Sequence, residues 1–477
     1  MTGPRPRAEP GPLAGVRVLD LTDESAVAGP RLLADLGADV VRAEPPGGDG
    51  VRRRAPFLGG SPGAERSLGH LYHNAGKRSV VLDRASPEGR AAFWGLVAAA
   101  DVIVETERLD PAEVIARNPA AVHVTVSPFG LDGPRAGWRA TDLILVAAGG
   151  LAFVSGDPAG PPVRPGADQA GQLAGLAAAA AAAIALAGRD RAPGRPGVHI
   201  DLSAQEVVAT TVVQTANPSR WAWQGQVPRR PGLGQVYQCA DGGWVTLTVR
   251  PARRERFARW AERAGARPGA DLRLLLEPGL DAAAAEPIIR SVVAAVPRGE
   301  MLAAIRDLDL MGLPVSTLAD LRDWDHLHAI AEFIDVPHET LGTALRFPRS
   351  PVGELAAVRP KRAPRLGEHT EAVLAEWARS ARGRDQDRAG GRDRAGGQDR
   401  AGGRLELATA LAGIRVVDFC WMLAGPLGTR LLSDFGAEVI RVEAGPRAYP
   451  DVFPPGTDDP STGAFHNTLN TQKRSVT

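Results

Sequence analysis

Short apolar runs recur along the first third of the chain and alternate with segments of helical spacing. Residues 31–38 (RLLADLGA) place apolar side chains every three to four positions and end near Gly37, which predicts a short helix. The apolar runs predict strands at 16–21, 39–44, 78–83, 101–105 and 121–130. Strands and helices that alternate at this spacing form βαβ units, so the predicted fold class is α/β with a parallel sheet.

Ligand binding is expected at one edge of this sheet, because open parallel sheets bind ligands beyond the carboxyl ends of their strands. The segments placed at that edge are 20–30, 44–50, 105–108 and 127–134. No GxGxxG motif follows the first strand, so the fingerprint of a nicotinamide-dependent dehydrogenase is missing. The pattern therefore predicts a binding site of another class.

The pattern changes between residues 221 and 320. Two β-rich runs flank Asp241-Gly242-Gly243 within 236–249, which predicts a hairpin, and Arg-rich helical segments follow it. We therefore predict three parts in the first copy of the fold: the N-terminal part of a large domain at 1–220, a smaller inserted α+β domain at 221–320, and a return to the large domain at 321–380.

The chain also repeats part of itself. The run LAGVRVLDL near the N-terminus returns as LAGIRVVDF from Leu411, and HNAGKRSVV from His73 returns as LNTQKRSVT. Between the copies, residues 381–407 repeat DRAGG with few apolar side chains, which predicts a flexible linker. Residues 408–477 are interpreted as the start of a second copy, either truncated here or belonging to a longer two-copy protein.

Composition excludes several classes of function. The 477 residues carry a formal net charge of +1, so bulk attraction to nucleic acid or to an anionic membrane is not expected. Two distant cysteines, Cys239 and Cys420, and an N-terminus without an apolar run favour a cytoplasmic protein. The most apolar run, 173–187, is shorter than a membrane span and predicts a buried helix. The histidines lack metal-ligand spacing, so no metal is expected.

Several motifs occur in the order seen in family III CoA-transferases, which include CaiB/BaiF-like proteins and α-methylacyl-CoA racemases. They are LLADLGADVVRAEPPGGD, NAGKRSVVLD, VSPFGLDGP, TDLILVAAGGLAFVSGDPAGPPVRPG, GRPGVHIDLSAQEVV, GLPVSTLADL and LGEHTEAVL. The chain resembles this family from about Leu13 to Trp377 and again in 408–477. The resemblance implies a Rossmann-like large domain, a smaller second domain and an interlocked homodimer. It also implies coenzyme A or an acyl-CoA as substrate, a small carboxylic acid as acceptor, and no metal.

The resemblance further implies a catalytic aspartate that attacks the acyl-CoA thioester, and this chain departs from that pattern. The matching slot, four residues before Gly175, holds Gly171, which has no side chain. Asp168 is the nearby carboxylate, interpreted either as a displaced nucleophile or as a solvated or helix-capping residue. The slot for a racemase histidine holds Thr141, so racemase activity is not favoured.

Three interpretations of the chain stay open. It is a CoA-transferase whose first copy is catalytically impaired, a non-catalytic CoA-binding or dimerisation subunit, or a truncated product that folds poorly. The second copy keeps the regular turn Leu423-Ala424-Gly425-Pro426, which fits a division of labour in which that copy carries the aspartate. The sequence does not specify the acyl donor or the acceptor acid.

Coenzyme A presents phosphates, which favour basic side chains and backbone N–H groups at strand ends. The residues that match the family's CoA-contacting stretches are Asn74, Lys77, Arg78, Thr106, Arg108, Ser127 and Phe129, with Asn470, Lys473 and Arg474 in the second copy. Any one basic residue alone suggests only an exposed charge, but recurrence in both copies favours binding. Glu44 ends the second predicted strand and is interpreted as contacting a ribose or capping a turn.

Overall fold

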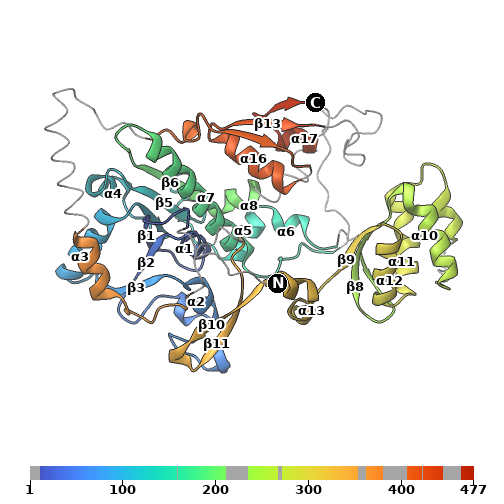
Figure 1. The fold of residues 1–477 in the computed structure, drawn as a ribbon, viewed down its shortest axis with the longest axis horizontal. Coiled ribbons are helices and arrows are strands. Elements are labelled where there is room, and N and C mark those ends of the chain that lie inside the picture. Colours follow the sequence, from blue (N-terminus) through green and yellow to red (C-terminus); the bar gives the residue numbers. More distant parts are fainter. Residues whose placement is uncertain are drawn as a thin grey trace, which may run out of the picture. The chain divides into compact units, whose positions relative to one another are not determined.

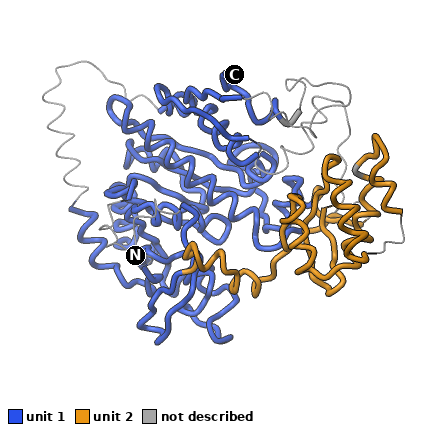
Figure 2. Tube along the Cα trace, turned by 45° about the vertical axis from the view of Figure 1, so that its right-hand side comes forward, with its two compact units in different colours: residues 1–152, 164–228, 334–477 blue, residues 153–163, 229–333 orange. Residues whose placement is uncertain are grey.

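The computed structural model describes residues 11–157, 160–210, 235–266, 271–352, 361–379, 405–421, 423–443 and 464–477. The chain divides into two compact units, coloured separately in Figure 2. The first contains Met1–Ala152, Arg164–Pro228 and Ile334–Thr477, and the second contains Phe153–Val163 and Arg229–Phe333. The predicted linker 381–407 lies outside the described residues as far as residue 404.

A six-stranded parallel sheet lies at the centre of the first unit (Figure 1). Its order is β3-β2-β1-β4-β5-β6, and the strands are β1 (Arg17–Leu21), β2 (Asp39–Glu44), β3 (Arg78–Val81), β4 (Val102–Glu105), β5 (Val122–Ser127) and β6 (Val198–Ser203). Leu19 of β1 pairs with Val41 on one side and Ile103 on the other, and all three side chains are fully buried. The prediction of an α/β fold with a parallel sheet is confirmed, and β6 adds an edge strand that was not predicted.

Helices connect these strands. They are α1 (Ala28–Asp35), α2 (Leu68–His73), α3 (Pro87–Ala99) and α4 (Pro111–Arg117), followed after β5 by α5 (Asp142–Ala148), α6 (Leu151–Val154), α7 (Gln169–Arg191) and, after β6, α8 (Ala204–Val208). The start of α3 is fixed by Ser86, whose hydroxyl accepts a hydrogen bond from the Gly89 N–H. Phe93 of α3 and Trp377 of helix 370–379 pack in one buried cluster with the sheet. A hairpin of β10 (Phe333–His338) and β11 (Thr343–Pro348) packs on α2 through Leu71.

Helices α1 and α7 cross in backbone contact. A Cβ placed on Gly175 of α7 would lie 2.8 Å from the Gly29 nitrogen, and one placed on Gly29 would lie 2.5 Å from the Gly175 oxygen. Alanines such as Ala174 and Ala178 are fully buried along the same helix. Small side chains in this segment therefore let α7 approach α1 more closely than ordinary side chains would permit.

The predicted burial of the run 173–187 is borne out by α7. Among the described residues, α7 is the one helix with enough length and hydropathy to cross a membrane, and half of its most apolar window is buried in the structure. Its contacts include α1, α5, α8 and the strands β5 and β6. The packing of a core helix therefore accounts for its apolar composition.

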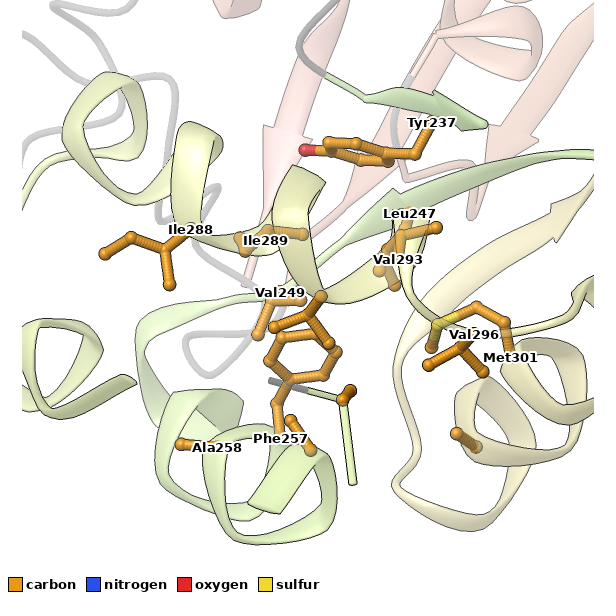
Figure 3. Packing of buried hydrophobic residues seen from close by; sticks show 14 of the residues in the cluster. Tyr237, Leu247, Val249, Phe257, Ala258, Ile288, Ile289, Val293, Val296 and Met301 are labelled. Atoms are coloured by element: carbon orange, nitrogen blue, oxygen red, sulfur yellow. The ribbon is translucent and has the colours of Figure 1, made fainter. Parts of the chain in front are cut away.

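The second unit is a small α+β domain. Its antiparallel sheet has the order β7-β8-β9, formed by β7 (Val236–Gln238), β8 (Trp244–Thr248) and β9 (Met311–Pro314). Helices α10 (Pro251–Arg263), α11 (Ala282–Ala294) and α12 (Arg298–Asp307) enclose a core in which Phe257, Val293 and Met301 are fully buried (Figure 3). The β7–β8 pairing confirms the predicted hairpin.

The predicted boundary of this domain at residue 320 differs from the compact unit, which extends to Phe333. Met311–Pro314 falls inside the predicted domain and pairs with β8 as the third strand of the small sheet. The helices α13 (Leu318–Asp323) and α14 (Asp325–Ala329) follow before the chain leaves the unit.

The C-terminal segment repeats the start of the fold. Strands β12 (Arg415–Asp418), β13 (Glu438–Val442) and β14 (Arg474–Val476) form a parallel sheet in that order, with α16 (Ala424–Asp434) and α17 (Ala464–Leu469). The segment packs on α7, where Ile184 contacts the cluster containing Ala410 and Leu411. The order β12-β13-β14 matches β1-β2-β3 of the N-terminal sheet.

Replacing Gly175 with alanine is expected to destabilise the protein by about 1–3 kcal/mol, because the added methyl group overlaps backbone atoms of α1. Gly95→Ala is the matched control. Gly95 also lies inside a helix, α3, but nothing lies within 4 Å of its Cβ position. Alanine there should raise stability by about 0.5–1 kcal/mol. Urea unfolding measures both changes, and equal midpoints for the two variants would contradict a close crossing.

Candidate functional site

A cavity of about 760 Å³ opens at the carboxyl ends of β1, β4 and β5. Loops after these strands and the start of α7 form its walls. The lining residues are Asp23, Glu24, Ser25, Arg54, Thr106, Arg108, Val126, Ser127, Pro128, Gly137, Trp138, Arg139, Ala140, Thr141, Asp142, Leu143, Leu145, Arg164, Asp168, Gly171 and Ala204. We refer to this cavity as the strand-end pocket.

The strand-end pocket collects several of the residues predicted from the sequence. Thr106, Arg108, Ser127, Asp168 and Gly171 all line it, although they are far apart in the chain. Phe129 stacks edge-on against the lining residue Trp138, with ring centroids 6.2 Å apart. The convergence predicted for the carboxyl edge of the sheet therefore holds for Thr106, Arg108 and Ser127, and the start of α7 adds Asp168 and Gly171.

The loop after β4 is held by a buried carboxylate. Glu105 accepts hydrogen bonds from the Arg108 N–H at 2.7 Å and from the Thr125 hydroxyl at 2.5 Å. Burial alone would raise the pKa of Glu105, but hydrogen bonds from His123 and Thr125 outweigh it and lower the pKa. An ionised Glu105 thus fixes the backbone of Arg108, whose φ is 60°, at the pocket wall.

Ser127 ends β5 with an unusual feature. Its hydroxyl oxygen is buried and has no hydrogen-bond partner in the described part of the chain, yet the residue lines the strand-end pocket. An unpaired buried hydroxyl is unfavourable, so it is commonly satisfied by a ligand or water. Ser127 therefore suits a ligand with an acceptor or donor group at the floor of the pocket.

The start of α7 brings Gly171 and Asp168 to the pocket. A Cβ placed on Gly171 would lie 3.2 Å from the main-chain oxygen of Glu24. The backbone of the β1–α1 loop therefore runs close to the place where a side chain at residue 171 would begin. Asp168 precedes the helix with φ at 25°. Its carboxylate receives a hydrogen bond from Arg164 Nη2 at 3.1 Å and another from Arg54.

Asp168 stands at the N-cap position of α7, and its main-chain carbonyl accepts a hydrogen bond from the Gln172 N–H at 3.1 Å. Its side chain makes no capping hydrogen bond to α7. That role is taken by Asp142, whose Oδ1 accepts from the Ala170 N–H at 2.7 Å while its Oδ2 lies 3.0 Å from Arg164 Nη2. The physical reason is that the two arginines draw the Asp168 carboxylate away from the helix end. With its side chain 36% exposed, Asp168 is partly solvated.

Asn74 and Lys77 lie in the interior, outside the lining of the pocket. Lys77 Nζ donates to Asp20 Oδ2 at 2.7 Å and to Asn74 Oδ1 at 2.9 Å, and Arg42 Nη1 lies 3.0 Å from the same Asp20 oxygen. Burial would raise the pKa of Asp20, but the charges of Lys77 and Arg42 lower it to about 2. Burial lowers the pKa of Lys77 to about 8, against the effect of Asp20. We call Asp20, Arg42, Asn74 and Lys77 the buried ion cluster.

Glu44 and Arg78 also have partners within the protein. Glu44 Oε1 lies 2.6 Å from Arg52 Nε, and its other oxygen accepts from the Ser79 hydroxyl at 2.7 Å. Arg78 pairs with Asp39 and with Glu376, the latter at 2.8 Å. Neither residue lines the strand-end pocket. Their predicted roles in binding CoA stay predictions.

The C-terminal segment repeats the aspartate, asparagine and lysine of the buried ion cluster. Lys473 Nζ lies 3.0 Å from Asp418 Oδ2 and 3.1 Å from Asn470 Oδ1, as Lys77 contacts Asp20 and Asn74. Arg474 pairs with Glu438 at 2.7 Å, as Arg78 pairs with Asp39. The recurrence of these residues in both segments is accounted for by the same internal ion pairs.

The comparisons with known proteins agree with this architecture. The model of CoA-transferase family III matches residues 13–370 and 411–477. The chain belongs to CoA-transferase family III. It is 30% identical over 385 residues to succinyl-CoA:(R)-benzylsuccinate CoA-transferase subunit BbsE of Thauera aromatica, covering 76% of this chain and 93% of that protein.

Two further similarities concern length and fold. The chain is 31% identical over 459 residues to Probable CoA-transferase Rv1866 of Mycobacterium tuberculosis, covering 90% of this chain but 53% of that protein. The crystal structure of a CAIB/BAIF family protein from Brucella suis matches with a TM-score of 0.64 at 26% identity, covering 77% of this chain and all of that one. We call the part of the chain before the C-terminal repeat the first segment. Its large domain thus has the Rossmann-like fold of the family.

Sequence reasoning about the family motifs missed several residues of the pocket. Asp142 and Arg164 lie within the family motif that begins TDLILV and ends PPVRPG. Their opposite charges were the one feature of the sequence that could have suggested an ion pair. Arg54 and Trp138 belong to no motif, and no periodicity marks them. Only the fold shows that Arg54, more than a hundred residues before Asp168, contacts that carboxylate.

Asp20→Asn is expected to destabilise the protein at neutral pH by about 3–5 kcal/mol, because it leaves Lys77 and Arg42 buried without their counter-charge. Folding lowers the pKa of Asp20 from 3.8 to about 2. The ionised carboxylate therefore stabilises the folded state fully above about pH 4, and this stabilisation is lost as the pH falls from about 4 to 2. The stability difference between wild type and variant should therefore shrink by about 2 kcal/mol toward pH 2. Urea unfolding across pH measures it, with exposed Asp132→Asn as control, and a pH-independent difference would contradict the pairing.

Proposed function

We propose that the first segment of this chain binds a CoA thioester in the strand-end pocket and cannot carry out the covalent step of CoA transfer by itself. The observation that carries the proposal is Gly171, which lines the pocket at the position where the family resemblance implies the nucleophilic aspartate. Arg108 and the unpaired Ser127 hydroxyl support binding, because a CoA thioester offers phosphates and a carbonyl oxygen to such donors.

The impairment follows from the chemistry of covalent CoA transfer. The aspartate carboxylate attacks the thioester carbonyl and expels the CoA thiolate, which leaves an acyl anhydride on the protein. The thiolate attacks the aspartyl carbonyl of that anhydride, releases the donor acid, and leaves an aspartyl thioester that passes CoA to the acceptor acid. Glycine provides no carboxylate for the first attack. Asp168 is engaged by two arginines, whose hydrogen bonds occupy both of its carboxylate oxygens.

A non-catalytic CoA-binding or dimerisation subunit is the second candidate. The bare Gly171 favours it, and two relatives carry names of subunits: BbsE of a succinyl-CoA:(R)-benzylsuccinate CoA-transferase and the beta subunit of the succinyl-CoA–L-malate CoA-transferase of Chloroflexus aurantiacus. In this view a carboxylate supplied by another segment or chain performs the transfer. The repeated fold of 411–477 supports a tandem arrangement in which the second copy has that role.

Gly171→Asp tests the proposal. Wild type should bind CoA without transferring it, whereas the variant should transfer CoA from succinyl-CoA to labelled acids at least about tenfold above background, because it regains a nucleophile. The new Cβ lies 3.2 Å from the Glu24 oxygen, so the loop must move by a few tenths of an ångström. Gly171→Asn has the same bulk without the nucleophile and serves as the control.

Mass spectrometry of the quenched reactions identifies the covalent adduct. An aspartyl adduct at residue 171 in the variant alone supports the proposal. An acyl or CoA adduct on Asp168 of wild type, with transfer lost in Asp168→Ala, would reject it and restore Asp168 as the nucleophile. Failure of wild type to bind CoA in calorimetry would reject the binding role of the pocket.

A further inference from the structure

The carboxylate of Asp168 lies between two arginines of the strand-end pocket and accepts a hydrogen bond from each. Arg54 reaches it from the chain between β2 and α2, and Arg164 reaches it from the segment before α7. The side chains of both arginines are 45% exposed, whereas that of Asp142, the other partner of Arg164, is 11% exposed and caps α7. Of the two acids, Asp142 is thus fixed by the helix, and Asp168 is held by the arginines alone.

The backbone around Asp168 is held in an unfavourable conformation. Ala167 and Asp168 both have positive φ, at 62° and 25°, and neither is glycine. A positive φ is unfavourable for alanine, whereas aspartate adopts it more readily than most other residues. The hydrogen bonds from Arg54 and Arg164 are the side-chain contacts of Asp168 in the described structure. A competing anion would have to replace these two hydrogen bonds to free the carboxylate.

We propose that Arg54 and Arg164 form an oxyanion-binding subsite of the strand-end pocket, in which Asp168 is a built-in counter-ion that a substrate anion displaces. Paired guanidinium groups recognise carboxylate and phosphate oxygens through charge-assisted hydrogen bonds. The incoming group is either the free carboxylate of a dicarboxylic acyl-CoA or a phosphate of CoA. This assignment of ligand rests on the proposed function, since it places the thioester in the same pocket.

Asp168→Asn removes the internal anion while keeping the size of the side chain, and asparagine tolerates positive φ. Succinyl-CoA and butyryl-CoA have acyl chains of equal length, but only succinyl-CoA ends in a carboxylate. Calorimetry should show that the variant raises the affinity ratio of succinyl-CoA to butyryl-CoA by about tenfold, which corresponds to one charge-assisted hydrogen bond gained. If a phosphate of CoA binds between the arginines, the affinity ratio of CoA to 3′-dephospho-CoA should rise in the variant instead. That result supports the subsite and identifies the phosphate as its ligand.

Variants of the arginines complete the test. Adding Arg54→Gln or Arg164→Gln to Asp168→Asn should abolish the gain in affinity ratio. Arg54→Lys in the same background should keep part of the gain, because lysine has the charge of arginine but not its planar guanidinium group. Arg117→Gln is the matched control, since Arg117 is 44% exposed and pairs with Glu113 on α4, outside the pocket. Thermal unfolding establishes that each variant is folded.

Free succinate is titrated in parallel, so the subsite is tested even if no thioester binds. Tighter succinate binding by Asp168→Asn that requires both arginines supports the subsite, and a simultaneous lack of CoA binding would reject the proposed function alone. Unchanged affinity ratios and unchanged succinate binding in Asp168→Asn would overturn the subsite. A gain that persists after Arg54→Gln and Arg164→Gln would overturn it as well.

Discussion

The close crossing of α1 and α7 determines where everything else in the pocket lies. Because Gly29 and Gly175 bring the two backbones into contact, the first turn of α7 is pressed against the β1–α1 loop. Gly171 then lies beside Glu24, and Asp168 lies within reach of Arg54. A wider crossing would move the start of α7 away from the strand ends and separate residues that line one cavity.

A second constraint comes from charges that the fold buries on the same sheet. Asp20 is held by Lys77 and Arg42, and Glu44 is held by Arg52, all of them fully or almost fully buried. Pairs of this kind are strongly unfavourable if either partner is lost, so they preserve the geometry of the strand ends. The charged groups of the strand-end pocket differ from these pairs, because Arg54, Arg164 and Asp168 remain partly exposed.

The elements that could be predicted from the sequence are those dictated by local chemistry. Apolar runs became parallel strands because both faces of such a sheet are buried, and Asp241-Gly242-Gly243 formed the turn of a hairpin. The gathering of Thr106, Arg108 and Ser127 followed from a general property of parallel sheets, whereas the place of Gly171 at the same cavity did not. Lys77 and Asn74 were harder to interpret, because a basic motif does not reveal that Asp20 lies opposite it in the fold. The cap of α7 was equally hidden, since Asp142 lies 28 residues before Ala170.

Helix α7 is shared by two segments of the chain. One side meets α1 at Gly175, and near its other end a Cβ on Gly188 would lie 2.8 Å from that of Ala410 in the C-terminal segment. Each of these two positions has room for a hydrogen atom alone, because a methyl group at either would overlap atoms of its neighbour. The two ends of one helix are therefore limited separately: enlarging Gly175 would push against α1, and enlarging Gly188 would push against the C-terminal segment.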